Sequence, residues 1–233
     1  MNLPFFDKIN IVWSVYMRKI VAIDGPSGSG KGTVAKKISE LCNYIYIDSG
    51  ATYRCVALAV LENNIDINDE KRIVQLAKTL NIKFDSSGKT FLNGKDVTKE
   101  IRSKNVTQIV SPISSIVELR EIMVDMQRKM ANESDVVMEG RDITTVVFPN
   151  ATYKFYLDAE VMTRAKRRFK QNKLVGIDMS LEEIIDNIKK RDYNDMHKLV
   201  GSLIRTEEQI YIDSTNLSID EVVNEMLKII RSE

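Results

Sequence analysis

The residues best suited to chemistry form one glycine-rich run, Gly25-Pro26-Ser27-Gly28-Ser29-Gly30-Lys31-Gly32-Thr33. Its glycines let consecutive backbone N–H groups turn toward one centre, because no Cβ atom blocks the required angles. Such donors at the start of a helix bind phosphates, and Lys31 adds a mobile positive charge. A buried-strand pattern precedes the run and a helical pattern follows it, which is the setting of a phosphate-binding loop. Residues 25–33 are therefore predicted to bind ATP.

The residue that follows Lys31 affects how the protein could bind Mg²⁺. The usual pattern has Ser or Thr there, as a ligand for Mg²⁺, but this sequence has Gly32 followed by Thr33. No Cys/His cluster of the kind that binds zinc occurs elsewhere. We therefore predict no metal site built by the protein alone, and expect Mg²⁺ to arrive with ATP, held by the nucleotide, water and a nearby hydroxyl.

Two further polar clusters follow predicted strands: Asp48-Ser49-Gly50-Ala51-Thr52-Tyr53-Arg54 and Glu139-Gly140-Arg141-Asp142. The carboxyl ends of parallel strands face one crevice, which the phosphate-binding loop also faces. Each guanidinium of Arg54 and Arg141 can donate two parallel hydrogen bonds to a phosphate. The clusters therefore predict a second phosphate site, which would hold the phosphate of an acceptor.

The elements that must position these clusters are short apolar runs separated by helical patterns. Near-continuous apolar character is typical of strands buried on both faces of a parallel sheet. Five such runs occur, at 19–24, 44–48, 135–139, 152–157 and 209–213. Helical patterns cover 31–41 and 161–170, and capping boxes at 180–183 and 218–221 open two more helices. This alternation predicts an α/β fold with a five-stranded parallel sheet flanked by helices.

The stretch between the second and third runs is too long for a simple crossover. Within it, residues 82–84 and 90–92 flank a turn signal, and Asn93-Gly94 offers a second tight turn before 95–97. We expect a small antiparallel sheet carried on helices at 49–133, inserted into one domain of residues 17–233. Residues 1–16 are expected to be an N-terminal extension whose role the sequence does not indicate.

Taken together, Gly-Pro-Ser-Gly-Ser-Gly-Lys-Gly-Thr, Asp-Ser-Gly-Ala-Thr-Tyr-Arg and Gly-Arg-Asp resemble the bacterial cytidylate kinase family, a nucleoside monophosphate kinase branch of the P-loop NTPases. The resemblance runs from about Met17 onward and includes the long insertion. It implies the P-loop NTPase fold, an insertion that binds the nucleoside monophosphate, and a short lid at 170–179. It also implies phosphorylation of CMP and dCMP by ATP with Mg²⁺, through direct in-line transfer.

The resemblance implies that ten positions contact the acceptor nucleotide: Ser49, Tyr53, Arg54, Ser111, Arg120, Arg141, Asp142, Arg191, Asp195 and Lys198. Of these, Arg54 and Arg141 would bind the acceptor phosphate in a pocket shaped by Ser49 and Tyr53. Arg191 and Asp195 would contact the sugar.

Ser111, Arg120 and Asp142 would read the edge of cytosine in this family. A carboxylate accepts a hydrogen bond from the exocyclic amine of cytosine, whereas uracil presents an oxygen there. Asp142 is therefore expected to discriminate against UMP. The sequence departs from the family pattern at Thr144, where glycine is usual, and at Lys198, where arginine is usual.

The acceptor phosphate is already anionic at neutral pH, so no strong general base is needed. The predicted catalytic residues are the cations that would stabilise the transferring phosphoryl group: Lys31, Arg164, Arg168 and Arg191. Arg164 and Arg168 lie four residues apart and share a helix face. Arg191 would also lie close to the phosphoryl group, and closure of the lid would exclude water.

Composition limits the other classes of function. The 233 residues carry 34 Lys and Arg against 33 Asp and Glu, a balance that disfavours a general nucleic-acid or anionic-membrane binder. Two cysteines, Cys42 and Cys55, and no apolar run of about 18 residues fit a reduced cytoplasmic protein, expected to be a monomer. A GTPase-like switch would need an Asn-Lys-X-Asp segment, which is missing. Another small P-loop kinase, for UMP or a metabolite, and a non-catalytic nucleotide-binding module remain alternatives.

Overall fold

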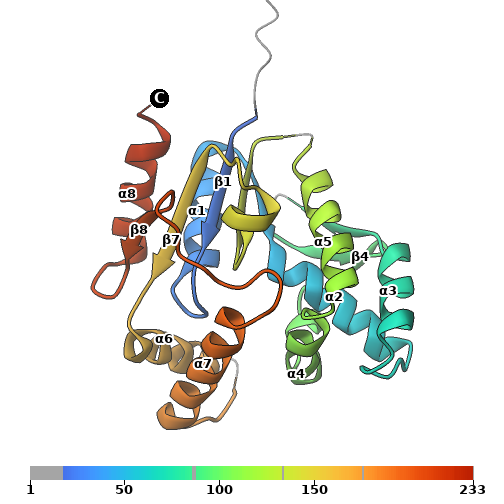
Figure 1. Cartoon of the computed structure of the whole chain (residues 1–233). Helices are drawn as coiled ribbons and strands as arrows, with labels where there is room; N and C mark the ends of the chain where they lie inside the picture. The colour runs from blue at the N-terminus through green and yellow to red at the C-terminus, as the bar shows by residue number, and fades with distance from the viewer. Residues whose placement is uncertain (1–17, 86–87, 133, 175, 233) are drawn as a thin grey trace, which may run out of the picture.

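The predicted apolar runs form one parallel sheet in the computed structural model, which describes residues 18–85, 88–132, 134–174 and 176–232. Its order confirms the predicted five-stranded architecture (Figure 1). The strands, from one edge to the other, are β2 (Ile45–Asp48), β6 (Val136–Gly140), β1 (Ile20–Asp24), β7 (Tyr153–Asp158) and β8 (Ile210–Asp213). The predicted extension at 1–16 lies outside the described residues.

The strand register gathers the polar clusters at one edge of the sheet. Asp48, the last residue of β2, pairs with Glu139 of β6, and Asp24, the last residue of β1, pairs with Gly140 of β6. Because all five strands run in one direction, the segments that follow them leave from the same side. The phosphate-binding loop and both predicted acceptor clusters therefore meet at this edge.

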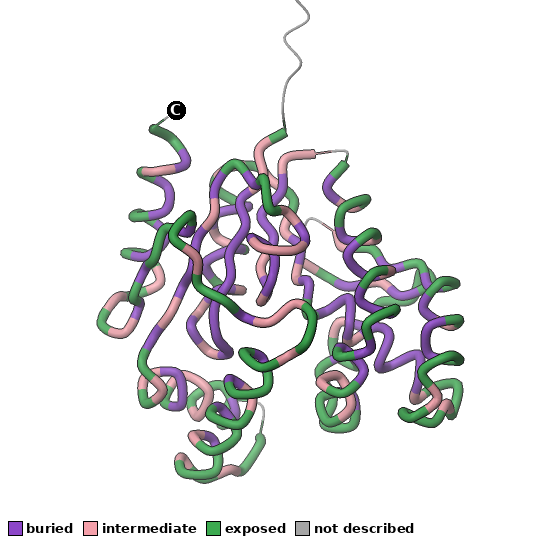
Figure 2. Tube along the Cα trace, in the orientation of Figure 1, coloured by how far each residue is buried: buried purple, intermediate pink, exposed green. Residues whose placement is uncertain are grey.

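Helices cover both faces of the sheet. On one face α1 (Lys31–Cys42) packs with α8 (Ile219–Ile230), through Val34, Ile38 and the stripe around Met226. The other face is covered by the end of α5 (Val117–Met130) and by η2 (Ile143–Val147), a π-helical turn. Figure 2 shows buried residues concentrated along the strands between these layers.

The long stretch after β2 builds a second, smaller body with its own apolar core, on one side of the sheet (Figure 1). Three short antiparallel strands confirm the predicted small sheet, in the order β3-β4-β5. The elements of this body are α2 (Ser49–Glu62), α3 (Glu70–Thr79), β3 (Ile82–Phe84), β4 (Thr90–Leu92), β5 (Lys95–Asp96), η1 (Glu100–Arg102), α4 (Lys104–Ile113) and α5.

Two helices lie between β7 and β8, α6 (Val161–Leu174) and α7 (Leu181–Met196), and they pack on each other through Ala165, Ile184 and Ile188. The expected end of the first helix at residue 170 was wrong. The helix continues one turn further, because Asn172 is buried in the contact and donates to Met179 Sδ at 3.7 Å. The first half of the predicted 170–179 lid is therefore helical.

Candidate active site

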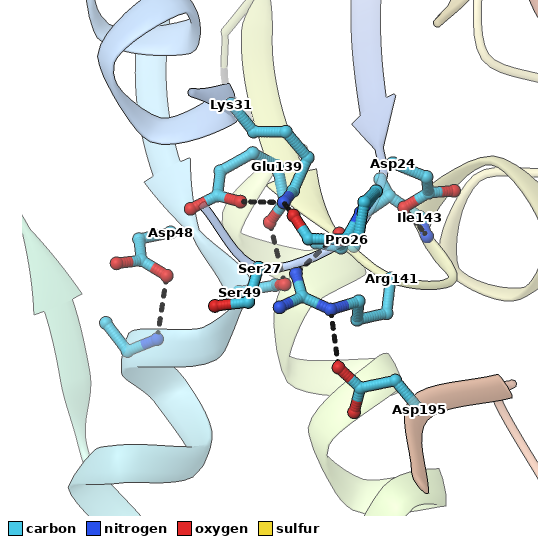
Figure 3. Close-up of polar contacts among 12 residues, drawn as sticks. Asp24, Pro26, Ser27, Lys31, Asp48, Ser49, Glu139, Arg141, Ile143 and Asp195 are labelled. Carbon is cyan, nitrogen blue, oxygen red and sulfur yellow. Dashed lines mark hydrogen bonds and ion pairs between the residues drawn. The ribbon is translucent and has the colours of Figure 1, made fainter. Parts of the chain in front are cut away.

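The phosphate-binding loop crosses from β1 to α1 at the centre of the sheet edge. Gly25 has φ +148°, and a Cβ atom there would lie 2.0 Å from the backbone oxygen of Leu157 on β7. No other residue fits that position without moving the strand. Lys31 is buried, and its Nζ donates to Pro26 O at 2.8 Å and lies 4.0 Å from Glu139 Oε2 (Figure 3). The lysine is thus folded against its own loop.

Burial shifts the pKa values of Lys31 and of its neighbour Glu139. Burial, and next the positive charge of Arg141, lower the pKa of Lys31 to about 7, although Glu139 opposes the shift. Burial and then Asp48 raise the pKa of the Glu139 carboxyl. Burial thus disfavours both the ammonium form of Lys31 and the carboxylate form of Glu139. A bound anion beside the lysine, or a bound cation beside the carboxylate, would stabilise the charged form. The arrangement is typical of a site that binds charged ligands.

Asp24, at the end of β1, is a functional residue that the sequence reasoning did not identify. Its buried carboxylate accepts hydrogen bonds from Ile143 N at 2.9 Å, Thr144 N at 2.8 Å and Thr144 Oγ1 at 2.6 Å. These bonds fix the start of η2, directly after Arg141 and Asp142. Asp24 thereby holds the segment carrying both predicted acceptor residues against the base of the phosphate-binding loop.

The predicted phosphate-binding arginines lie close to one another in front of the loop. We call the region between Arg54, Arg141 and Arg191 the crevice. Arg141 Nε donates to Asp195 Oδ2 at 2.8 Å (Figure 3). Arg191 Nη1 donates to Ser27 Oγ at 3.4 Å. Arg54 Nη1 donates to Thr107 Oγ1 at 2.9 Å. Burial and then Arg141 lower the pKa of Arg191 to about 10, and burial followed by Arg102 lowers the pKa of Arg54. These cations repel one another, so the crevice favours a multiply charged anion.

The predicted base-reading pair is also assembled. Arg120 Nη2 forms a buried ion pair with Asp142 Oδ2, and Arg120 Nη1 donates to Ser114 O at 3.1 Å. Among the described residues, Arg120 Nε finds no hydrogen-bond acceptor. The guanidinium carbon lies 5.5 Å from the centre of the Tyr53 ring, so Tyr53 supports this pair. The pair thus offers a donor and a carboxylate side by side.

The remaining predicted acceptor residues lie around Arg141 and the Arg120–Asp142 pair. Lys198 Nζ donates to Ser114 Oγ at 3.1 Å and lies 3.5 Å from Asp195 Oδ1. Ser49 Oγ is turned toward β6, where it donates to Glu139 O at 2.7 Å. Ser111, on α4, contributes its backbone oxygen to Ser114 Oγ at 2.9 Å.

The two predicted catalytic arginines of α6, Arg164 and Arg168, occupy different environments. Arg164 is buried and donates to Ala159 O at 2.8 Å and to Ser27 O at 3.1 Å, and its Nη2 lies 2.7 Å from Asp192 Oδ2. It braces the phosphate-binding loop in this structure. Arg168 is half-buried, and burial followed by Arg102 and Arg141 lowers its pKa. Arg164 therefore contacts the phosphate-binding loop directly, whereas Arg168 lies in the field of Arg102 and Arg141.

Besides Asp24, three residues at this site were not assigned from the sequence. Glu139 is a carboxylate at the end of the apolar run 135–139, and that position is a signal that could have identified it. Arg167 donates to Ser29 O at 3.1 Å, and Arg102 from η1 reaches Asp48 Oδ2 at 3.1 Å. Arg167 lies between Lys166 and Arg168, and Arg102 lies two residues from Glu100 and from Lys104, so nothing local distinguishes them.

The residues near Thr33 suit a magnesium ion carried by a nucleotide. A cavity of about 550 Å³ is lined by Thr33, Asp48 and Glu139, which supply the hydroxyl and carboxylate oxygens that Mg²⁺ prefers. Burial, and next the charge of Asp48, raise the pKa of the Glu139 carboxyl, so a bound cation would favour its charged form. Within the described part of the chain, no group of three His, Cys, Asp or Glu residues could hold a metal.

Comparison with known proteins places the site in context. The family model described as "Cytidylate kinase" matches residues 21–232. The chain is 46% identical over 211 residues to the cytidylate kinase of Caldanaerobacter subterraneus subsp. tengcongensis, covering 91% of this chain and 94% of that protein. It is 45% identical to the cytidylate kinase of Lactobacillus johnsonii over 216 residues, with the same two coverages. A crystal structure of an uncharacterized protein from Eubacterium ventriosum shares the fold, with TM-score 0.52, 16% identity and coverage of 93% and 100%.

Proposed function

This chain belongs to the cytidylate kinase family, and on that premise we propose how its own residues transfer the γ-phosphoryl group of ATP to the phosphate of CMP or dCMP. One observation carries the proposal: three arginines from different elements, Arg54, Arg141 and Arg191, share the crevice in front of the phosphate-binding loop. One crevice thus has cationic groups for both reacting phosphates.

ATP binds with its phosphates on the backbone N–H groups of residues 25–33. Lys31 Nζ donates to Pro26 O, and bound ATP draws the ammonium group away from this carbonyl and toward the phosphates. When Mg²⁺ is bound with ATP, it neutralises phosphate charge, and Asp48, Glu139 and Thr33 are the residues that would hold it or its water. The donor is then fixed at the centre of the sheet edge.

CMP binds across the crevice with its phosphate on Arg54 and Arg141 and its sugar beside Arg191 and Asp195. Cytosine lies against the Arg120–Asp142 pair, near Ser111, and the free Nε of Arg120 donates to the base. Lys198 approaches the same pocket through Ser114. The carboxylate of Asp142 accepts from the exocyclic amine, which is the basis for rejecting UMP.

In the reaction, an oxygen of the CMP phosphate attacks the γ-phosphorus of ATP. The bond between that phosphorus and the β–γ bridging oxygen breaks, and ADP leaves with the electron pair. Lys31, Arg168 and Arg191 stabilise the charge of the transferring group, and alignment supplies much of the acceleration. Arg164 acts on the same step through the phosphate-binding loop, because its guanidinium donates to Ser27 O.

The cellular setting is proposed on more general grounds. Cys42 and Cys55 are both free thiols, as is usual in the reducing cytoplasm, and CMP kinase activity would serve pyrimidine metabolism there. No described helix is long and apolar enough to cross a membrane. We propose that residues 49–133 act as the acceptor-binding insertion and that the segment around residues 170–179 closes over ATP, in a protein that works as a monomer.

The direct test is ADP formation from ATP and Mg²⁺ with CMP, dCMP, UMP, AMP and shikimate supplied separately. We expect fast turnover with CMP and dCMP and slow turnover with UMP. Equal rates with UMP would contradict the role of Asp142. Absence of turnover with every nucleoside monophosphate would overturn the proposed reaction.

A further inference from the structure

A buried polar network lies behind the acceptor pocket and has no role in the mechanism above. Gln209, just before β8, is buried, and its Nε2 donates to Thr144 Oγ1. Thr144 is also buried, and its hydroxyl donates to Asp24 Oδ2 at 2.6 Å. The three residues form a continuous chain from the strand that enters the phosphate-binding loop to the segment that leads into β8.

Gln209 also holds the chain segment that precedes it. Its Oε1 accepts from Thr206 N at 2.7 Å, and its Nε2 lies 3.5 Å from Ile204 O. We call residues 197–206 the acceptor strap; they run between α7 and β8 without helix or strand. One glutamine amide therefore satisfies backbone groups of the strap that regular secondary structure leaves unpaired.

The other end of the strap lies on the base-reading pair. A Cβ atom at Gly201 would be 1.9 Å from Arg120 Nη2 and 2.5 Å from Asp142 Oδ2, so the glycine backbone packs directly against this pair. Leu203 N donates to Asp195 O at 2.8 Å, and Lys198 belongs to the same segment. The position of the strap thus determines how closely the base-reading pair is covered.

We propose that Gln209 is a positioning residue for the acceptor nucleotide. Through Thr144 it fixes the strap relative to Asp24, and the strap in turn keeps the Arg120–Asp142 pair and Lys198 in place for CMP. The proposal rests on the proposed CMP kinase function. Because Gln209 touches no reacting atom, its loss affects binding of the acceptor far more than the binding of ATP or the phosphoryl transfer itself.

The test compares Gln209→Ala, Thr144→Val and the double variant with the unmodified protein. For each single variant we expect the KM for CMP to rise about tenfold, as for loss of a buried hydrogen bond, with the KM for ATP unchanged and kcat lowered less than twofold. Both variants break the contact between Gln209 and Thr144, and each also removes a bond of its own, to Thr206 N or to Asp24. The double variant is therefore expected to raise the KM by less than the product of the two single effects. Additive effects, or an unchanged KM for CMP, would overturn the proposal.

The chain offers a matched control in Gln127, a buried glutamine of α5 whose Nε2 donates to Thr52 Oγ1 of α2 at 2.9 Å. Gln127→Ala removes the same chemical contact and is expected to lower the melting temperature by a similar amount. If Gln209 positions the acceptor strap specifically, Gln127→Ala leaves the ratio of the KM for CMP to the KM for ATP unchanged. An equal rise in the KM for CMP in Gln127→Ala would show general loosening and reject the proposal.

A second readout separates this proposal from the proposed function. Amide hydrogen exchange in the strap is measured without substrates, and Gln209→Ala is expected to speed exchange at residues 203–206 at least fivefold while Gln127→Ala does not. Turnover of CMP by the unmodified protein tests the function alone. Unchanged exchange in the strap contradicts the positioning role even if the protein is an active CMP kinase.

Discussion

At the scale of single residues, the site consists of charges that are buried before any ligand arrives. Lys31 is enclosed by its own loop, and its surroundings contain Arg141 and Arg191 as well as Glu139. The sequence predicted Lys31 because its neighbours are glycines. It could not predict the contact with Glu139, since that partner lies 108 residues away and only the pairing of β1 with β6 brings it near.

The lowered pKa of Lys31 predicts a pH dependence of ATP binding. In the free protein the pKa is about 7, and the phosphates of ATP raise it by stabilising the ammonium form. Above pH 7 ATP binding must therefore take up a proton, and affinity should fall by up to about tenfold per pH unit between pH 7 and 9. Isothermal titration at pH 8 in two buffers of different ionisation enthalpy measures the proton uptake. Lys31→Met is the control and should show none.

Asp142 predicts the basis of selectivity among pyrimidines. In Asp142→Asn the carboxylate that should repel O4 of uracil becomes an amide that can donate to it. We expect the ratio of kcat/KM for CMP to that for UMP to fall at least tenfold. Asp125→Asn makes the same change on an exposed ion pair with Lys129 and should leave the ratio as it was. A preserved ratio in Asp142→Asn would assign the discrimination to another group.

At the scale of elements, the parts that local sequence determines were predicted and the parts that packing determines were not. The five strands and both capping boxes were predicted because apolar runs and Ser-x-x-Glu spacing are local signals. The extra turn of α6 was missed because it depends on burial of Asn172 against Met179. The link from Thr144 to Gln209 joins residues 65 apart, and no local pattern marks it.

The capping box of α8 predicts a loss of stability without a loss of chemistry. Ser218 Oγ accepts from Glu221 N at 3.3 Å, and α8 packs on α1 behind the phosphate-binding loop. Ser218→Ala should lower the free energy of unfolding by about 1 kcal/mol, as measured by urea denaturation. The KM values at 25 °C should stay the same. Ser232→Ala, near the end of the same helix, is a matched control because it removes a hydroxyl without removing an N-cap.

At the scale of the whole molecule, two apolar cores meet at a crevice lined by like charges. The core of the insertion and the cores of the sheet are separate clusters. Burial lowers the pKa of Arg54 and of Arg168, and arginines across the gap add to each shift. Self-repulsion of this kind opposes the compact ligand-free state. Substrate phosphates would neutralise this repulsion. The arginine charges that the reaction needs therefore lower the stability of the folded protein.

Arg168→Met tests this conflict. Burial and the cations of Arg102 and Arg141 disfavour the charge of Arg168, so its removal should raise the free energy of unfolding of the ligand-free protein by up to about 1 kcal/mol. The same change should lower kcat roughly a hundredfold, because a stabilising charge in the transition state is lost. Lys166→Met, on the exposed part of the same helix, should change neither quantity appreciably. A destabilised Arg168→Met would contradict the repulsion argument.

The base-reading pair is divided between the two bodies of the molecule, since Arg120 comes from the insertion and Asp142 follows β6. In the proposed function, recognition of cytosine is therefore a property of the junction and belongs to neither part by itself. An exchange of residues 49–133 for the insertion of another kinase would leave Asp142 as a buried carboxylate without its guanidinium. Transplanting acceptor preference into this scaffold, by recombination or by design, would require changing both sides of the crevice at once.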